Sequence, residues 1–231
     1  NGYWKLLGAF EQNWDLLLGN LGENWWICEA AFKPYASCRY MHYPVDVFKK
    51  LIKENNLKPE EIENVHVKIS SPGYRTVGLI KKAENNVDAQ FSLPLAFGAL
   101  IHGSDLGPTW QEESMKDPRY AAFAQKVNVE ENVKSNQIMM DDLRENGYFS
   151  RCPSIVTLTA RGITFIDSTE YAWGDPWKEE TRMTDEELKQ KFKRFAVQIL
   201  GDDKCQEVIN IVEYLEKIDD IGKELMPLLR I

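Results

Sequence analysis

Apolar residues recur with the period of an α-helix in several separate stretches of the chain. Residues 45–57 carry one apolar face with lysines outward, and residues 91–103 are apolar on all sides and rich in small residues, which is typical of a buried helix. His102, at the end of the second stretch, is expected to cap that helix. Two further helices are predicted, over residues 118–127 and over residues 3–18, where the apolar positions are Tyr3, Leu6, Leu7, Phe10, Trp14, Leu17 and Leu18.

Strict alternation marks the predicted strands. Val65, Val67 and Ile69 alternate with polar residues, which predicts a half-buried strand with His66 on its solvated face. Residues 155–159 and 163–166 flank a turn that contains Gly162 and together predict a hairpin. The polar residues 128–152 are interpreted as a loop; the adjacent Asp141 and Asp142 lack a third hard ligand at loop spacing, so a solvated pair is favoured over a metal site.

The last fifty residues return to a helical pattern. Thr184 and Glu187 have the spacing of a capping box, and the helix that follows is expected to end at Gly201. A final helix carries Val208, Ile211, Val212 and Leu215. The order of helix, mixed strands and helices, then helices indicates an α+β fold flanked by segments of an all-helical layer.

Composition and charge argue against some classes of binding partner. The 231 residues carry a net charge of −8, which argues against general binding to nucleic acid or to a membrane surface. No run of apolar residues is long enough to span a bilayer, and the opening that starts at Asn1 lacks the pattern of a signal peptide. Four widely spaced cysteines favour reduced thiols in a cytoplasmic protein over a zinc site.

A basic stretch, residues 32–44, is the main candidate for chemistry, because it gathers Lys33, Arg39 and His42 within ten residues. Pro44 suits the first turn of a helix, so Arg39 and His42 are expected just ahead of a helix N-terminus. Two cations and an imidazole beside that positive end suit a substrate with carboxylates. The alternative is an ordinary basic surface loop.

Three blocks of sequence resemble one known family. They are residues 32–42 (FKPYASCRYMH), residues 87–94 (VDAQFSLP), and residues 156–192, which run from VTLT through the Gly174-Asp175-Pro176 loop to MTDEELKQKF. In this order and spacing they resemble the 2-methylcitrate dehydratase (MmgE/PrpD) family, which also contains cis-aconitate decarboxylase and iminodisuccinate epimerase. The resemblance covers the C-terminal half of the family sequence, whose members are roughly twice as long.

The resemblance implies a lid-type α+β domain inserted between segments of an all-helical domain. In this chain residues 1–27 would belong to the helical domain, residues 28–177 would form the lid, and residues 178–231 would supply the closing helices. The helical segments should then expose apolar residues that the first half of the family sequence covers. These residues are Tyr3, Leu7, Phe10, Trp14, Phe192, Phe195 and Ile199.

The resemblance also implies roles for individual residues. Lys33 and His42 would be catalytic, with a solvated lysine and a helix N-cap as their alternatives. Arg39 would bind a substrate carboxylate in bidentate fashion, with a structural ion pair as its alternative. Gln90 and Ser92 would supply neutral hydrogen bonds to the substrate or simply cap the buried helix. No metal and no cofactor is expected.

The implied activity is that of a lyase or isomerase that abstracts a proton next to a carboxylate of a small di- or tricarboxylic acid, with dehydration favoured. The expected assembly is a homodimer or a complex with a partner chain that supplies the rest of the helical domain. The competing hypothesis is a non-catalytic fragment or assembly subunit, since acid, histidine and lysine positions of the family's active site lie in its first half.

Overall fold

The computed structural model describes residues 6, 8, 13–23 and 25–230, and it divides the chain into two units, 1–31 and 32–231. In the first unit the helix α2 (Trp14–Leu18) and the 3-10 helix η1 (Trp26–Glu29) are described. The helix predicted over residues 3–18 is therefore seen only in its last part, and Tyr3, Leu7 and Phe10 lie outside the described residues. Trp14 is 52% exposed.

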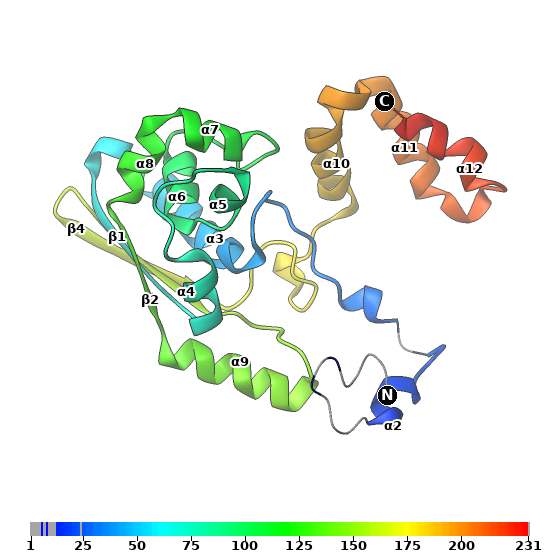
Figure 1. Ribbon diagram of the computed structural model, residues 1–231, viewed down its shortest axis with the longest axis horizontal. Helices are drawn as coiled ribbons and strands as arrows, with labels where there is room; N and C mark the ends of the chain where they lie inside the picture. The colour runs from blue at the N-terminus through cyan, green and yellow to red at the C-terminus, as the bar shows by residue number, and fades with distance from the viewer. Residues whose placement is uncertain (1–5, 7, 9–12, 24, 231) are drawn as a thin grey trace. The chain divides into compact units, whose positions relative to one another are not determined.

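The second unit is built on one mixed four-stranded sheet, in the order β2-β1-β3-β4 (Figure 1). Its strands are β1 (Ile62–Ile69), β2 (Val127–Glu131), β3 (Ser154–Ala160) and β4 (Ile163–Thr169). β1 pairs with β2 in parallel and with β3 antiparallel, and β3 forms a hairpin with β4. The predicted strand and the predicted hairpin are confirmed. Arg161 and Gly162 form the hairpin turn, both with positive φ, which a two-residue hairpin turn of this kind requires.

Helices cover one face of this sheet (Figure 1). The inward residues of β1 (Val65, Val67 and Ile69) are buried beneath α3 (Arg39–Glu54) and α6 (Leu93–Ile101). Phe48 of α3 stacks on Phe97 of α6 with ring centroids 4.1 Å apart. The remaining helices of this unit are α4 (Ser71–Val77), α5 (Asn86–Gln90), α7 (Trp110–Lys116), α8 (Pro118–Ala124), α9 (Val133–Asn146), α10 (Asp185–Leu200), α11 (Asp202–Glu213) and α12 (Ile221–Glu224). Short 3-10 turns complete it: η2 (Pro59–Glu61), η3 (Glu179–Thr181), η4 (Leu215–Lys217) and η5 (Met226–Leu229).

The opposite face of the sheet is polar, as the alternation in β1 predicted. His66 and Lys68 point to this face, and both lie beside Glu130 of β2, with nitrogen–oxygen distances of 3.1 and 3.0 Å. His66 is therefore a surface residue of the strand, in agreement with its interpretation from the sequence. His102 also behaves as expected, because its Nδ1 lies 2.8 Å from the carbonyl oxygen of Gly98 at the end of α6.

The expected start of the helix after the basic stretch is wrong. α3 begins at Arg39, so Arg39 and His42 lie inside its first turns and Pro44 lies within the helix. The Cys38 N–H donates to the Gln90 carbonyl (3.1 Å), which fixes the chain just upstream of the first turn. Pro44 has no N–H, so one hydrogen bond inside α3 is missing.

The polar stretch 128–152 is not a loop, as the sequence suggested, but contains β2 and α9. The buried face of α9 is formed by Ser135, Met139 and Asp142, at helical spacing. Two of these three residues are polar, so no apolar stripe marks the helix in the sequence. Asp142 is only 1% exposed and pairs with Arg151, so it is not solvated either.

α10 follows the predicted boundaries but buries little, while α11 ends at Glu213 and so leaves Leu215, expected in the last helix, in the turn η4. The capping box is present, with the Thr184 hydroxyl oxygen accepting from the Glu187 N–H at 3.2 Å, and Gly201 ends α10. No residue of α10 is buried, and Ile199 is 60% exposed. An open apolar groove between α10 and α11 is lined by Leu188, Phe192, Val208 and Val212. Of the apolar residues expected to be exposed on α10, Ile199 is exposed, whereas Phe192 and Phe195 are half-buried.

None of the helices described is both long enough and apolar enough to cross a membrane.

We expect Gly98→Ala to destabilise the protein, although glycine-to-alanine changes in helices usually stabilise by up to about 1 kcal/mol. A Cβ at Gly98 would lie 2.5 Å from the backbone oxygen of Tyr120, where α6 and α8 pack. Overpacking of this kind costs about 1–3 kcal/mol, measurable by urea denaturation. Gly222→Ala in α12 is the matched control, since only the Asp220 side chain is near, and it should be neutral or slightly stabilising. A higher unfolding free energy for Gly98→Ala would contradict the packing described.

Candidate active site

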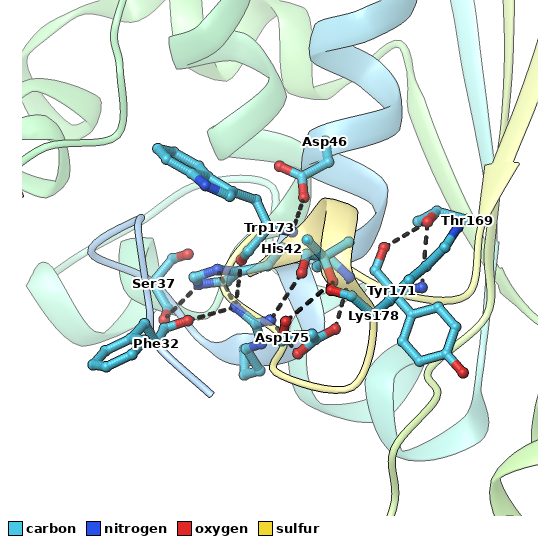
Figure 2. Close-up of polar contacts among 12 residues, drawn as sticks. Phe32, Ser37, His42, Asp46, Thr169, Tyr171, Trp173, Asp175 and Lys178 are labelled. Carbon is cyan, nitrogen blue, oxygen red and sulfur yellow. Dashed lines mark hydrogen bonds and ion pairs between the residues drawn. The ribbon is translucent and has the colours of Figure 1, made fainter. Parts of the chain in front are cut away.

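One face of α3 carries a row of polar side chains. Arg39, His42, Asp46 and Lys49 follow each other at intervals of three or four residues, so they share this face over three turns. Two loops lie against it, residues 32–38 before the helix and residues 172–175 after β4 (Figure 2). Segments far apart in the sequence therefore meet along a single helix.

Arg39 joins the two loops. Its Nη1 donates to the Phe32 carbonyl at 2.9 Å and to the Trp173 carbonyl at 3.1 Å. Its Nη2 contacts the Ala172 carbonyl at 3.4 Å and forms an ion pair with Asp175. The structural ion pair that the sequence left open is thus present. Binding of a substrate carboxylate by Arg39 stays a prediction.

Asp175 is completely buried and is held in place by the turn that carries it. Its second carboxylate oxygen accepts from the Ala172 N–H at 2.7 Å. Gly174 has a φ of +94°, and a Cβ there would collide with the carbonyl of Phe32, whose N–H donates to the Gly174 carbonyl at 2.9 Å. Only glycine allows the two loops to approach this closely.

Asp46 provides a second link about two turns further along α3 than Arg39. It accepts the Trp173 N–H at 2.7 Å (Figure 2) and the Tyr35 hydroxyl at 2.6 Å. Lys49 in turn donates to the Tyr35 oxygen at 3.1 Å. Burial raises the pKa of Asp46, while the hydrogen bonds from Tyr35 and Trp173 act in the opposite direction. Asp46 therefore holds one residue of each loop.

His42 lies between these two links and is fully buried. Its Nδ1 is 3.1 Å from Arg39 Nη1, its Nε2 is 3.5 Å from the Ser37 carbonyl, and its ring centroid is 5.0 Å from that of Tyr35. Burial, and next the charge of Arg39, lower the pKa of His42 to about 3. The sequence singled out His42 because a free histidine titrates near neutrality, but here the ring is neutral at physiological pH. It is not an N-cap either, since Cys38 occupies that position.

Lys33 is the exposed cation of the group. Among the described residues none forms a hydrogen bond or an ion pair with its ammonium, yet its charge contributes to lowering the pKa of His42. Lys33 therefore lies within electrostatic reach of the imidazole and remains open to a ligand.

Gln90 contacts this region through its backbone carbonyl, and Ser92 lies at the start of α6. The Gln90 carbonyl accepts the Cys38 N–H, as described above. The fully buried Ser92 hydroxyl donates to the Ile80 carbonyl at 2.5 Å and accepts the Leu95 N–H at 3.1 Å, so it caps α6. The capping alternative for Ser92 is thus observed. Substrate binding by either residue stays a prediction.

Asp46 and Asp175 were not among the residues expected in the site. Asp46 could have been found from its position seven residues after Arg39, which places both on one helix face. Asp175 stands in the Gly174-Asp175-Pro176 loop of the third family-like block, but nothing in the sequence pairs it with Arg39. No group of three or more metal-ligating side chains occurs among the residues that the structure describes.

We expect Asp175→Asn to lower the free energy of unfolding by about 3 kcal/mol, because it leaves a partly buried guanidinium without its counter-charge. The asparagine oxygen can still accept the Ala172 N–H, so the effect reports mainly the lost charge. Asp141→Asn is the matched control, since it breaks an exposed ion pair to Arg144 and should cost less than about 1 kcal/mol. Equal effects in chemical denaturation would show that Asp175 does not hold the loops.

Comparison with known proteins points to the same family as the sequence motifs. Residues 35–217 match the model of the MmgE/PrpD C-terminal domain. The chain is also similar to human cis-aconitate decarboxylase, with 25% identity over 226 residues, which cover 92% of this chain and 43% of the human protein. The chain thus spans less than half the length of this curated relative. The chain belongs to the MmgE/PrpD family.

Proposed function

We propose that this chain is part of a lyase or isomerase that acts on a small di- or tricarboxylic acid by abstracting a proton from a carbon next to a carboxylate, with dehydration as the proposed reaction. The observation that carries the proposal is the group of Lys33, Arg39 and His42. An open cation and a buried imidazole lie beside two loops that Arg39 and Asp46 hold together. Membership of the MmgE/PrpD family supports the same reaction class.

The proposed step places negative charge on the oxygen of an enolate-like intermediate. Cations and N–H donors fixed in a site of low dielectric stabilise such charge by about 3–4 kcal/mol per well-placed donor. Lys33 would bind a substrate carboxylate or transfer a proton, and His42 would act on the same substrate. Arg39, Gln90 and Ser92 would complete the binding of the substrate. This chemistry needs no cofactor.

The proposal extends to the architecture. Residues 28–177 would form a lid inserted between helical segments contributed by residues 1–27 and 178–231. The exposed Ile199, the absence of any buried residue in α10 and the groove between α10 and α11 support this arrangement, because an amphipathic helix is stabilised mainly by packing of its apolar face. Helices from the rest of the protein, or from a partner chain, would cover them, and the assembly would be a cytoplasmic homodimer.

We expect Lys33→Ala to lower kcat by about 10²-fold or more in the protein that carries this chain, without changing its melting temperature, because the side chain is exposed. Turnover is measured by NMR on a panel of citrate-like acids. Lys53→Ala, on an exposed part of α3, is the control and should leave turnover unchanged.

Lys33→Arg separates the two roles of the ammonium. If Lys33 transfers a proton, the arginine variant keeps KM but loses kcat, since a guanidinium does not give up its proton at neutral pH. If it only binds a carboxylate, both constants are largely retained. Unchanged turnover of Lys33→Ala would remove Lys33 from the site. Absence of turnover in the wild-type protein on every acid of the panel would favour the non-catalytic assembly subunit.

A further inference from the structure

The contact between Arg39 and His42 determines where the imidazole carries its proton. A guanidinium has N–H donors and no acceptor, so His42 Nδ1, 3.1 Å from Arg39 Nη1, can face it favourably only with its lone pair. The two hydrogens of Nη1 are shared between this nitrogen and the carbonyls of Phe32 and Trp173. Nδ1 must therefore offer its lone pair. In the neutral ring the proton then lies on Nε2, which faces the Ser37 carbonyl at 3.5 Å.

Arg39 cannot easily turn away from this position. Asp175 and the carbonyls of Phe32, Ala172 and Trp173 hold its two terminal nitrogens, as described above. Figure 2 shows Phe32, Trp173 and Asp175 grouped on the same side of the helix. A change of the Arg39 rotamer would break all of these contacts, one of them an ion pair to a fully buried carboxylate. The arginine is therefore a fixed donor at Nδ1.

The charged groups that face the ring oppose a second proton. Arg39 and Lys33 are both cations, and burial adds to their effect. The other neighbours are the Tyr35 ring and the Ser37 carbonyl, which carry no charge. Among the described residues no carboxylate forms a hydrogen bond or an ion pair with His42. An imidazolium at this position would lack a counter-ion.

We propose that Arg39, held by Asp175, is a positioning residue that fixes His42 as the neutral tautomer protonated on Nε2, so that the ring is not a base for the substrate. The part of this inference that concerns the substrate rests on the proposed function. Because His42 is fully buried and its Nε2 faces the Ser37 carbonyl, the ring supports the loop of residues 32–38, which carries Lys33.

Nitrogen-15 NMR of the histidine side chains tests the inference on the wild-type protein that carries this chain, with no substrate present. His42→Gln assigns the signal of His42. We expect the neutral tautomer protonated on Nε2, unchanged between about pH 8 and about pH 5, the range in which an unperturbed histidine titrates. A proton on Nδ1, or titration of His42 within this range, would overturn the inference.

Arg39→Gln tests the role of the arginine itself. An amide side chain can donate or accept, so His42 should populate both tautomers and should titrate at a higher pH than in the wild type. An unchanged tautomer and an unchanged pH response in a folded Arg39→Gln variant would contradict the assignment of Arg39. Arg39→Lys keeps the positive charge but loses the planar guanidinium. Compared with Arg39→Gln, it should therefore restore the low pKa of His42 more fully than the preference for the tautomer protonated on Nε2.

A measurement without any variant covers the case in which Arg39→Gln does not fold. The hydrogen bond from Arg39 to His42 Nδ1 should give a scalar coupling between the two nitrogens in the wild-type protein, and its absence at a resolved His42 signal would count against the contact. The two proposals fail separately. Absence of turnover on carboxylic acids would refute the proposed function and leave the tautomer unaffected, whereas titration of His42 near neutrality would refute this inference in an active enzyme.

Discussion

The ion pair between Arg39 and Asp175 is the interaction on which the rest of the site depends. It connects the first turn of α3 to a loop 136 residues further along the chain, and the same guanidinium holds the loop that precedes the helix. Asp175 is fully buried, and the pair persists because the Ala172 N–H satisfies the carboxylate while neighbouring carbonyls satisfy the two terminal nitrogens of the guanidinium. The buried Nε of Arg39 has no hydrogen-bond partner among the described residues. The position of His42, and the protonation that we propose for it, follow from this constraint.

Much of the fold could be predicted because it is encoded by short-range patterns. The alternation in β1, the glycine turn between β3 and β4, and the capping box at Thr184 each lie within a few residues, and the structure confirms all three. Prediction failed where tertiary contacts determine where a helix forms or begins. α9 buries Ser135 and Asp142 instead of an apolar stripe, and α3 continues upstream of Pro44 because Cys38 bonds to the backbone of a distant segment.

The candidate site was found from the sequence only in part. The spacing of Lys33, Arg39 and His42 identified the right stretch, but spacing does not show which partners a charged group finds. Asp46 lies further along α3, and Asp175 lies in the loop after β4. Together with the basic residues they hold the two loops in place. Burial also reverses the expected behaviour of His42, since a pKa near neutrality requires solvent or a counter-charge that this position lacks.

These contacts suggest a division of roles in which Arg39 and Asp46 fix the loops around the buried His42, while the exposed Lys33 meets the substrate. The most direct test is a crystal structure of the protein that carries this chain with a tricarboxylic acid bound. The account predicts that a ligand oxygen lies within hydrogen-bond distance of Lys33, with Arg39 still bound to Asp175. A ligand bound away from Lys33, or residues 172–175 displaced from α3, would contradict it.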